Sequence, residues 1–352
     1  NPFAARFDPG FYNYGSLGLL LNSAAIHAGR AAGFVDANPD TLRPSGLPVP
    51  TGTELLVCRL VTALLGAGTV AFIVGTGRHL YGDAAGIVAG GLYAVAPLAV
   101  QHAHFATVDV PATFFVAGGL YFAAAYPSPP NPLSPRTVEK GGVPNADGSP
   151  STTPLSPPPM GRGAGGEGFL LLAGIFAGLA AATKYNAGLV LLSGIVAWLL
   201  MKEKKPLGLV ALVGGAALGF ALGCPGVFLN PERFFADLAF EAKHVATGHG
   251  QVFVQTAPGW VYHVFFNLRW GLTLPLLVAT LWAVGVAVAR RRRGDAVLAA
   301  FALAYYLLIG FAAVKFARYT LPLLPPLFLL AGAAWDGWKN VRAERGYRLF
   351  TA

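Results

Sequence analysis

The sequence predicts an all-α integral membrane protein, a bundle of several membrane-spanning helices. Of its 352 residues, 55% are hydrophobic and only 12% are charged, about half the charged share of an ordinary soluble domain. The mean hydropathy is +0.56. A soluble domain of this length cannot bury so much apolar surface. The apolar runs are therefore expected to face a bilayer.

The apolar runs define the predicted spans, because a helix of about 20 mostly apolar residues is long enough to cross a bilayer. We predict nine spans, at 54–76, 84–101, 108–126, 169–183, 186–201, 207–223, 266–289, 296–314 and 319–337. They form three groups of three, in 54–126, 169–223 and 266–338. The stretch 169–201 is too long for one crossing at about 1.5 Å per residue. The polar tetrapeptide at 183–186 is expected to divide it.

Four segments lie outside these groups. Residues 1–53 are expected to be the remainder of the first extracytoplasmic loop, with an amphipathic surface helix at 15–33. The alternative for 15–33 is a tenth span. The Pro-, Gly- and Ser-rich stretch 127–168 predicts a disordered cytoplasmic loop. Residues 224–265 are expected to form an extracytoplasmic loop, and 339–352 a basic cytoplasmic tail.

The net charge of +9 is explained by the orientation of the chain in the membrane. With 1–53 outside, most of the 25 Lys and Arg residues fall on the cytoplasmic side, including the run Arg290–Arg293. This distribution follows the positive-inside rule. No module that combines basic and aromatic residues for nucleic-acid binding is apparent, so nucleic acid is not an expected partner. Membrane lipid is.

Four cations lie at the predicted extracytoplasmic face. They are Arg59, Lys184, Lys315 and Arg318. Charged groups at membrane depth are costly and tend to be paired or functional. Guanidinium groups bind phosphate oxygens in a forked geometry, so these cations predict a site for a lipid-linked phosphate. The alternative is that they extend to the interface without a function in binding.

Asp109 begins a predicted span, two residues before Pro111. One interpretation is a helix N-cap followed by Pro in the first turn. The other is a carboxylate that faces the outer cavity and holds an acceptor or a metal. His102 and His104 lie nearby, and the three could bind zinc if the segment were a loop. No cofactor is certain, and a divalent metal is left open.

The remaining candidates are aromatic or imidazole side chains. Tyr14 precedes the surface helix, and His244 and His249 flank a glycine-rich turn. They are either polar loop residues or contacts to a donor or acceptor sugar or phosphate. No Walker loop or soluble nucleotide-binding fold is apparent, so we expect an activated donor from within the membrane.

The residues resemble a known family, the polytopic glycosyltransferases with the GT-C fold and in particular their family 39 type. That type includes dolichyl-phosphate-mannose protein mannosyltransferases and lipid A aminoarabinose transferases. The order and topology of several weak motifs carry the resemblance, which extends over nearly the whole chain except 127–168. These are Tyr14–Leu17, Cys58–Gly66, Gly77–Gly82, Ala96–Pro111, Gly178–Asn186, Asn230–His249 and Arg318–Pro325.

The resemblance implies a membrane glycosyltransferase. Its donor would be a polyprenyl-phosphate-linked sugar, its acceptor a hydroxyl on protein, lipid or glycan, and its active site would face outward from a bacterial-type inner membrane. Transfer would invert the sugar. Arg59, Lys184 and Arg318 would balance the leaving phosphate, and Asp109 matches an acidic residue on the acceptor or metal side.

The general base is the one part of the implied site that this sequence does not match. Family members place a carboxylate in the first extracytoplasmic loop, in an Asp-Glu motif after the first span. Asp8 does not match that motif. We therefore expect the base and its span to precede Asn1, and residues 1–352 alone to be inactive. Residues 8–11 also differ from the aminoarabinose transferases, which weakens the prediction of a lipid A acceptor.

Two other functions fit the same composition. A transporter or flippase for lipid-linked sugars would need the cations but no base. A noncatalytic membrane scaffold would tolerate loss of the cations.

Overall fold

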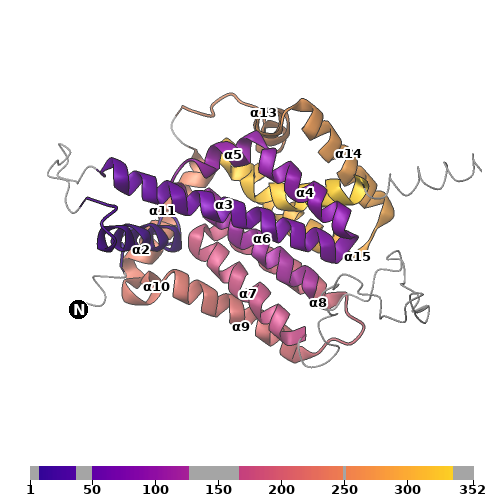
Figure 1. Ribbon diagram of the computed structural model, residues 1–352, viewed down its shortest axis with the longest axis horizontal. Helices are drawn as coiled ribbons and strands as arrows, with labels where there is room; N and C mark the ends of the chain where they lie inside the picture. The colour runs from indigo at the N-terminus through magenta and orange to yellow at the C-terminus, as the bar shows by residue number, and fades with distance from the viewer. Residues whose placement is uncertain (1–7, 37–49, 127–165, 249–250, 336–352) are drawn as a thin grey trace, which may run out of the picture.

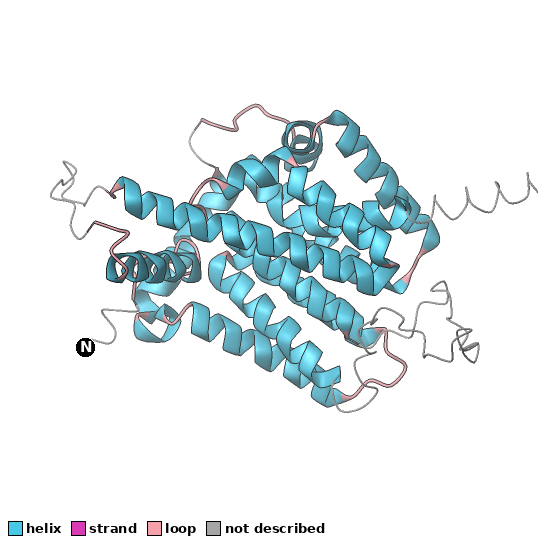
Figure 2. Cartoon of the chain, viewed as in Figure 1, coloured by secondary structure: helices cyan, strands magenta, loops and turns pink. Residues whose placement is uncertain are grey.

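The computed structural model describes residues 8–36, 50–126, 166–248 and 251–335, and every regular element in these ranges is a helix (Figure 2). The α-helices, labelled as in Figure 1, are α2 (Leu17–Ala31), α3 (Gly52–Tyr81), α4 (Asp83–Val95), α5 (Pro97–Ala103), α6 (Asp109–Ala125), α7 (Gly166–Thr183), α8 (Leu191–Leu199), α9 (Pro206–Gly223), α10 (Gly226–Leu229), α11 (Pro231–Thr247), α12 (Gly259–Tyr262), α13 (Arg269–Leu272), α14 (Leu274–Arg290) and α15 (Arg293–Phe311). Two 3-10 helices, η1 (Tyr185–Val190) and η3 (Ala317–Leu323), and one π-helix, η2 (His263–Leu268), join them. A last helix covers 324–335.

Four of these helices are long and apolar enough to cross a membrane, namely α3, α7, α9 and α15. The pair α4 and α5 adds a fifth if it is one span, bent by 60°. Pro97 begins α5 after Ala96 leaves the helical conformation, since proline disfavours a helical residue before it. Three further apolar helices are shorter: α6, η1 with α8, and α14. The all-α membrane fold is thus confirmed.

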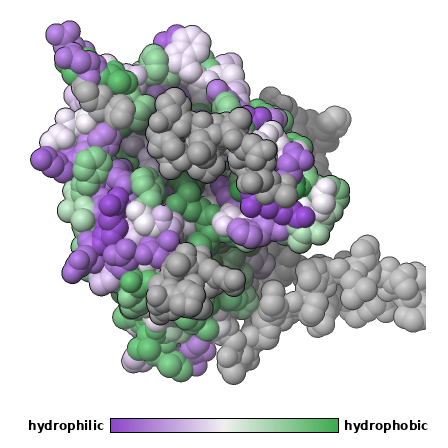
Figure 3. Space-filling view, turned by 90° about the vertical axis from the view of Figure 1, so that its left-hand side faces the viewer, coloured by the Kyte–Doolittle hydropathy of each residue, from purple (hydrophilic) through white to green (hydrophobic). Residues whose placement is uncertain are grey.

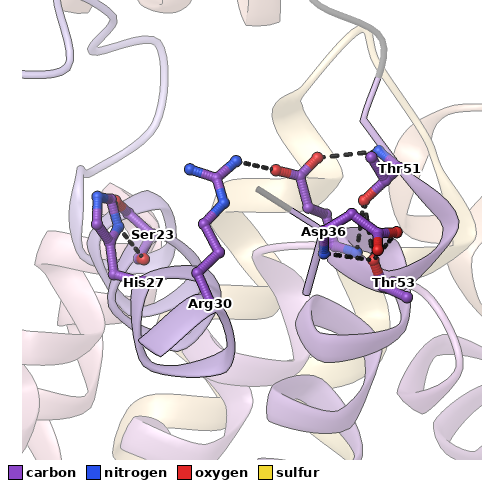
Figure 4. Close-up of polar contacts among 7 residues, drawn as sticks. Ser23, His27, Arg30, Asp36, Thr51 and Thr53 are labelled. Carbon is purple, nitrogen blue, oxygen red and sulfur yellow. Dashed lines mark hydrogen bonds and ion pairs between the residues drawn. The ribbon is translucent and has the colours of Figure 1, made fainter. Parts of the chain in front are cut away.

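Helix α2 lies against the beginning of α3 (Figure 4). Arg30 of α2 forms an ion pair with Glu54 of α3, and Glu54 also accepts a hydrogen bond from the Thr51 amide at 2.9 Å. Thr51 and Glu54 together form a capping box. With 15 residues, α2 is about 22 Å long, less than the ~30 Å hydrocarbon core. This length favours the surface position over a tenth span.

Helices α7 and α9 pack with their backbones in close contact. Glycines on both helices make this possible: a Cβ at Gly174 would lie 2.0 Å from the Leu212 carbonyl oxygen, and one at Gly178 would lie 2.1 Å from that of Ala216. Small residues four apart commonly allow such approach between membrane helices.

Replacing Gly178 by Ala is expected to destabilise the protein by about 1–3 kcal/mol, because the added methyl group overlaps backbone atoms of α9 that cannot move locally. Gly214→Ala is the matched control, since a Cβ there has no neighbour within 4 Å, and it should be neutral or stabilising. Thermal unfolding in detergent measures both. Equal melting temperatures for the two variants would contradict this account of the packing.

The described part of segment 224–265, which the sequence analysis expected to be an extracytoplasmic loop, contains α10, α11, α12 and the first residues of η2. The longest of them, α11, begins as a capped helix: Asn230 Oδ1 accepts from the Arg233 amide at 3.3 Å, and Pro231 is the first helical residue. The predicted disordered loop 127–168 lies outside the described residues up to 165, as does the tail 339–352.

The segment before α2 is held on α11. The Tyr12 amide donates to Asp237 Oδ2 at 2.8 Å, and Asn230 Nδ2 donates to Asp8 Oδ2 at 2.9 Å. The Tyr12 hydroxyl also donates to Asp8, and Tyr12 is fully buried. This hydrogen bond is the main cause that holds the pKa of Asp8 below its ordinary value of 3.8.

The attachment of this segment should therefore depend on pH. Because the pKa of Asp8 is lower in the folded state than in the unfolded state, the ionised carboxylate stabilises the folded state. This stabilisation is complete above about pH 4 and is lost as the pH falls through the pKa of the folded state. The protection factor of the Tyr12 amide, which is the intrinsic exchange rate at each pH divided by the observed rate, should fall as the pH drops through that window. Asp8→Asn should show a low protection factor already at neutral pH and no such dependence. A wild-type profile that Asp8→Asn leaves unchanged would contradict the role of Asp8.

Candidate functional site

Asp109 is the first residue of α6, and its side chain is directed at Lys184. The Lys184 Nζ to Asp109 Oδ1 distance is 2.6 Å, and Asp109 is 2% exposed. The N-cap is Val108, and no side chain caps this helix. The prediction that Asp109 is an N-cap is therefore wrong. A buried carboxylate gains more from an ammonium partner than from a backbone amide at a helix end.

Lys184 is placed by the break between α7 and η1. Its backbone is extended, with φ −152° and ψ 115°, so the side chain leaves the helix axis at this point. Lys184 is 6% exposed, and its Nζ lies 4.0 Å from the centroid of the Tyr319 ring. A buried ammonium needs such partners, because desolvation of an unpaired charge costs several kcal/mol.

Arg318 reaches the same carboxylate from η3. Its Nε lies 3.6 Å from Asp109 Oδ2, and its guanidinium carbon lies 4.5 Å from the centroid of Phe316. Unlike Lys184, the Arg318 side chain is 34% exposed. Three predicted site residues from separate elements thus meet, with two cations on one carboxylate. We call Asp109, Lys184 and Arg318 the charge cluster.

Four buried polar atoms near the charge cluster have no hydrogen-bond partner in the described ranges. They are His102 Nδ1, Thr107 Oγ1, Asn186 Oδ1 and the Tyr305 hydroxyl, of which the last two side chains are near each other. Thr107 and Asn186 each lie two residues from a member of the charge cluster. His102 and Tyr305 both interact electrostatically with Asp109. A buried polar atom without a partner costs about 1–3 kcal/mol, and in native structures such atoms often mark a functional site.

Tyr14 lies near the charge cluster, because the Tyr185 hydroxyl, one residue after Lys184, donates to the Tyr14 carbonyl at 3.3 Å. Burial is the main cause that raises the pKa of Tyr14, and the negative charge of Glu241 adds to it. Glu241 of α11 is half-buried and makes no ion pair with any described residue.

Glu241 and Tyr305 are residues that the sequence analysis did not single out. The sequence Asn230-Pro231-Glu232 is a helix-start signal, so a helix that includes Glu241 could have been predicted. Tyr305 lies in an apolar run with no polar pattern around it. No local signal could have found it.

Lys315 and Arg59 do not join the charge cluster. Lys315 is 8% exposed, and its Nζ donates to Thr256 Oγ1 at 2.9 Å. Arg59 is exposed on α3 between exposed leucines, including Leu56 and Leu60, and makes no ion pair with a described residue. Its position fits a side chain that extends along the lipid-facing surface.

The histidines are dispersed. His104 is exposed, and its Nδ1 lies 2.7 Å from the Val100 carbonyl oxygen. His244 stacks on Phe240 within α11, and His249 lies outside the described residues. Among the residues that the structure describes, no three His, Cys, Asp or Glu side chains are grouped so that they could hold a metal.

The end of the bundle that carries α2, α10 and α11 is the face seen in Figure 3. Hydrophilic and hydrophobic residues are mixed on it, unlike the continuous apolar surface expected of a helix side in lipid. The sequence and this face together fit an end of the bundle that lies at a membrane–water boundary.

The helical fold is similar to that of solved GT-C polytopic membrane proteins. A family model described as dolichyl-phosphate-mannose-protein mannosyltransferase matches residues 51–127, from the start of α3 through α6. No curated protein sequence matches the chain.

Several solved structures are similar in fold over almost the whole chain. ArnT from Cupriavidus metallidurans in the apo state is 19% identical with a TM-score of 0.59, and covers 93% of this chain and 50% of its own. ArnT bound to undecaprenyl phosphate is 20% identical with a TM-score of 0.55, covering 95% and 59%. The archaeal oligosaccharyltransferase AglB from Archaeoglobus fulgidus, in complex with an inhibitory peptide and a dolichol-phosphate, is 13% identical with a TM-score of 0.51, covering 96% and 44%. The chain thus spans about half the length of these proteins.

Proposed function

We propose that the protein is a glycosyltransferase that moves a sugar from a polyprenyl-phosphate donor to a hydroxyl acceptor. The observation that carries the proposal is the charge cluster, where Lys184 and Arg318 converge on Asp109 beside unpartnered buried polar atoms. ArnT and AglB, which share the fold, have been solved with undecaprenyl phosphate and dolichol-phosphate.

The cluster has the chemistry that a leaving lipid phosphate requires. Negative charge develops on the phosphate as the bond to the sugar breaks, and fixed cations stabilise that charge. Arg318 is the accessible member, since 34% of its side chain is exposed and its planar donors suit phosphate oxygens. Asp109 acts as a positioning residue that holds both cations at one place.

The acceptor side needs a base that takes the hydroxyl proton during attack. We propose an inverting transfer on the face away from the basic cytoplasmic segments, in a bacterial-type inner membrane. Tyr14 and His102 are proposed as donor or acceptor contacts because both lie near the charge cluster. Lys315, His104, His244 and His249 remain predicted contacts only. Arg59, which is exposed on α3 apart from the charge cluster, is not proposed as a contact.

The test uses the complete natural protein in proteoliposomes with a labelled sugar on polyprenyl phosphate. We expect free polyprenyl phosphate and labelled acceptor to appear together, and Arg318→Ala to remove most of both. Arg59→Ala is the matched control for loss of one charge. Movement of intact sugar-linked lipid between leaflets, with no bond broken, would show that the protein is a flippase and not an enzyme. Lipid binding that Arg318→Ala leaves unchanged would favour a scaffold.

A further inference from the structure

An apolar groove runs along α14 and α15, away from the charge cluster. Its volume is about 550 Å³, within the range of sites for small amphiphiles. From Leu277 to Arg291, both in its lining, the groove follows α14 for about 21 Å. One leaflet of the hydrocarbon core is about 15 Å thick. The groove is therefore long enough for an acyl chain.

The wall of the groove offers no free polar group along its length. Thr280 Oγ1 donates to the Leu276 carbonyl within α14 at 2.8 Å. The Tyr306 hydroxyl donates to the Trp260 carbonyl at 2.6 Å. With these two groups satisfied, the lining is otherwise apolar as far as its end at Arg291, Arg292 and Asp295. Only a hydrocarbon chain fits such a wall without loss of hydrogen bonds.

The end of the groove is basic and partly uncompensated. Arg290 is already neutralised, because its Nε and Nη2 each lie 2.8 Å from an oxygen of Asp295. Tyr81 donates to the same carboxylate at 2.6 Å. Arg291 is exposed and Arg292 half-buried, and neither makes an ion pair within the described ranges. The groove ends at Arg291, Arg292 and Asp295, and Asp295 is already paired with Arg290. The net positive charge of this end complements an amphiphile with an anionic head.

This basic end lies far from the charge cluster. Val110, next to Asp109, faces the middle of α3 at Gly66. Tyr81, which holds Asp295 at the basic end, lies fifteen residues further along the same helix, or about 22 Å. A donor lipid with its phosphate at the charge cluster would bring only uncharged tail to Arg291 and Arg292. The donor therefore does not account for these two cations.

We propose that this groove binds an anionic glycerophospholipid from the leaflet at the basic end, with its phosphate on Arg291 and Arg292 and one acyl chain along α14. The lipid joins α14 to α15 and to the helix 324–335, whose Leu327 and Leu330 line the groove. This site is separate from the donor site and is independent of the proposed transfer reaction.

The test compares phosphatidylglycerol with phosphatidylcholine of the same acyl chains, added to the complete protein in neutral detergent. Native mass spectrometry gives the affinity, and thermal unfolding gives the stabilisation. Wild type should prefer phosphatidylglycerol on the order of tenfold. Arg291→Gln with Arg292→Gln should remove the preference, whereas Arg78→Gln should not, because Arg78 is paired with Asp83.

A second pair of variants tests the apolar part without changing charge. Ala296→Trp places a ring in the groove and should abolish binding of phosphatidylglycerol. Leu222→Trp adds the same ring at an exposed position of α9 and should leave binding intact. Equal affinity for the two phospholipids in wild type would overturn the proposal. So would displacement of phosphatidylglycerol by equimolar undecaprenyl phosphate, which would assign the groove to the donor tail.

Discussion

Asp109→Asn is expected to destabilise the protein by about 3–5 kcal/mol, because it leaves the Lys184 ammonium buried without a counter-charge. Lys184 is 6% exposed and has its Nζ 2.6 Å from the carboxylate. The Tyr319 ring and Arg318 do not replace that charge, since one is neutral and the other positive. The free energy of unfolding in detergent measures the effect.

A double-mutant cycle separates the ion pair from the general effect of substitution. Asp109→Asn combined with Lys184→Met removes both charges and should recover much of the lost stability, with a coupling energy of about 2 kcal/mol or more. Asp83→Asn is the surface control. Its partner Arg78 is 3.2 Å away in an exposed pair, so the change should cost less than about 1 kcal/mol. Additive losses in the double variant would show that Asp109 does not stabilise Lys184.

The overall fold could be predicted because a bilayer makes composition decisive. In the described residues, helices lie in each of the nine predicted apolar segments, and four of these helices are long and apolar enough to cross a membrane. Backbone groups in lipid must be hydrogen-bonded within their own segment, which leaves helices as the element for such runs. The order of several weak sequence motifs also predicted the GT-C fold, which the comparison with ArnT supports.

The geometry of the site could be predicted only in part. Residue type singled out Asp109, Lys184 and Arg318, because charges are scarce and costly in apolar segments. The contact of Asp109 with these cations could not be predicted, since Asp109 and Lys184 are 75 residues apart in sequence. The local pattern of Asp109 before Pro111 suggested an N-cap, and the distant lysine overrode it.

The same reasoning could not separate the four cations from one another. Arg59, Lys315 and Arg318 have similar sequence surroundings at helix ends, yet the structure places them differently. Arg59 is exposed on α3, Lys315 hydrogen-bonds to Thr256, and Arg318 meets Asp109. Only tertiary contacts distinguish a cation that can share a ligand from one that cannot.

Arg318→Ala is accordingly expected to weaken binding of undecaprenyl phosphate about 100-fold or more. Its guanidinium can donate two charge-assisted hydrogen bonds to one phosphate, each worth about 1.5–3 kcal/mol. Arg318→Lys should weaken binding by an intermediate factor, because an ammonium keeps the charge but loses the forked geometry. Titration of the purified protein with the lipid, followed by intrinsic fluorescence or native mass spectrometry, gives the affinities.

Arg59→Ala removes the same charge from a position that the structure keeps apart from Asp109, so it should change the affinity less than about threefold. Unfolding of Arg318→Ala should stay close to wild type, because the Arg318 side chain is one-third exposed and its contact with Asp109 is 3.6 Å long. A loss of affinity without a loss of stability assigns Arg318 to the ligand. If Arg59→Ala weakens binding as much as Arg318→Ala does, the phosphate binds elsewhere than at the charge cluster.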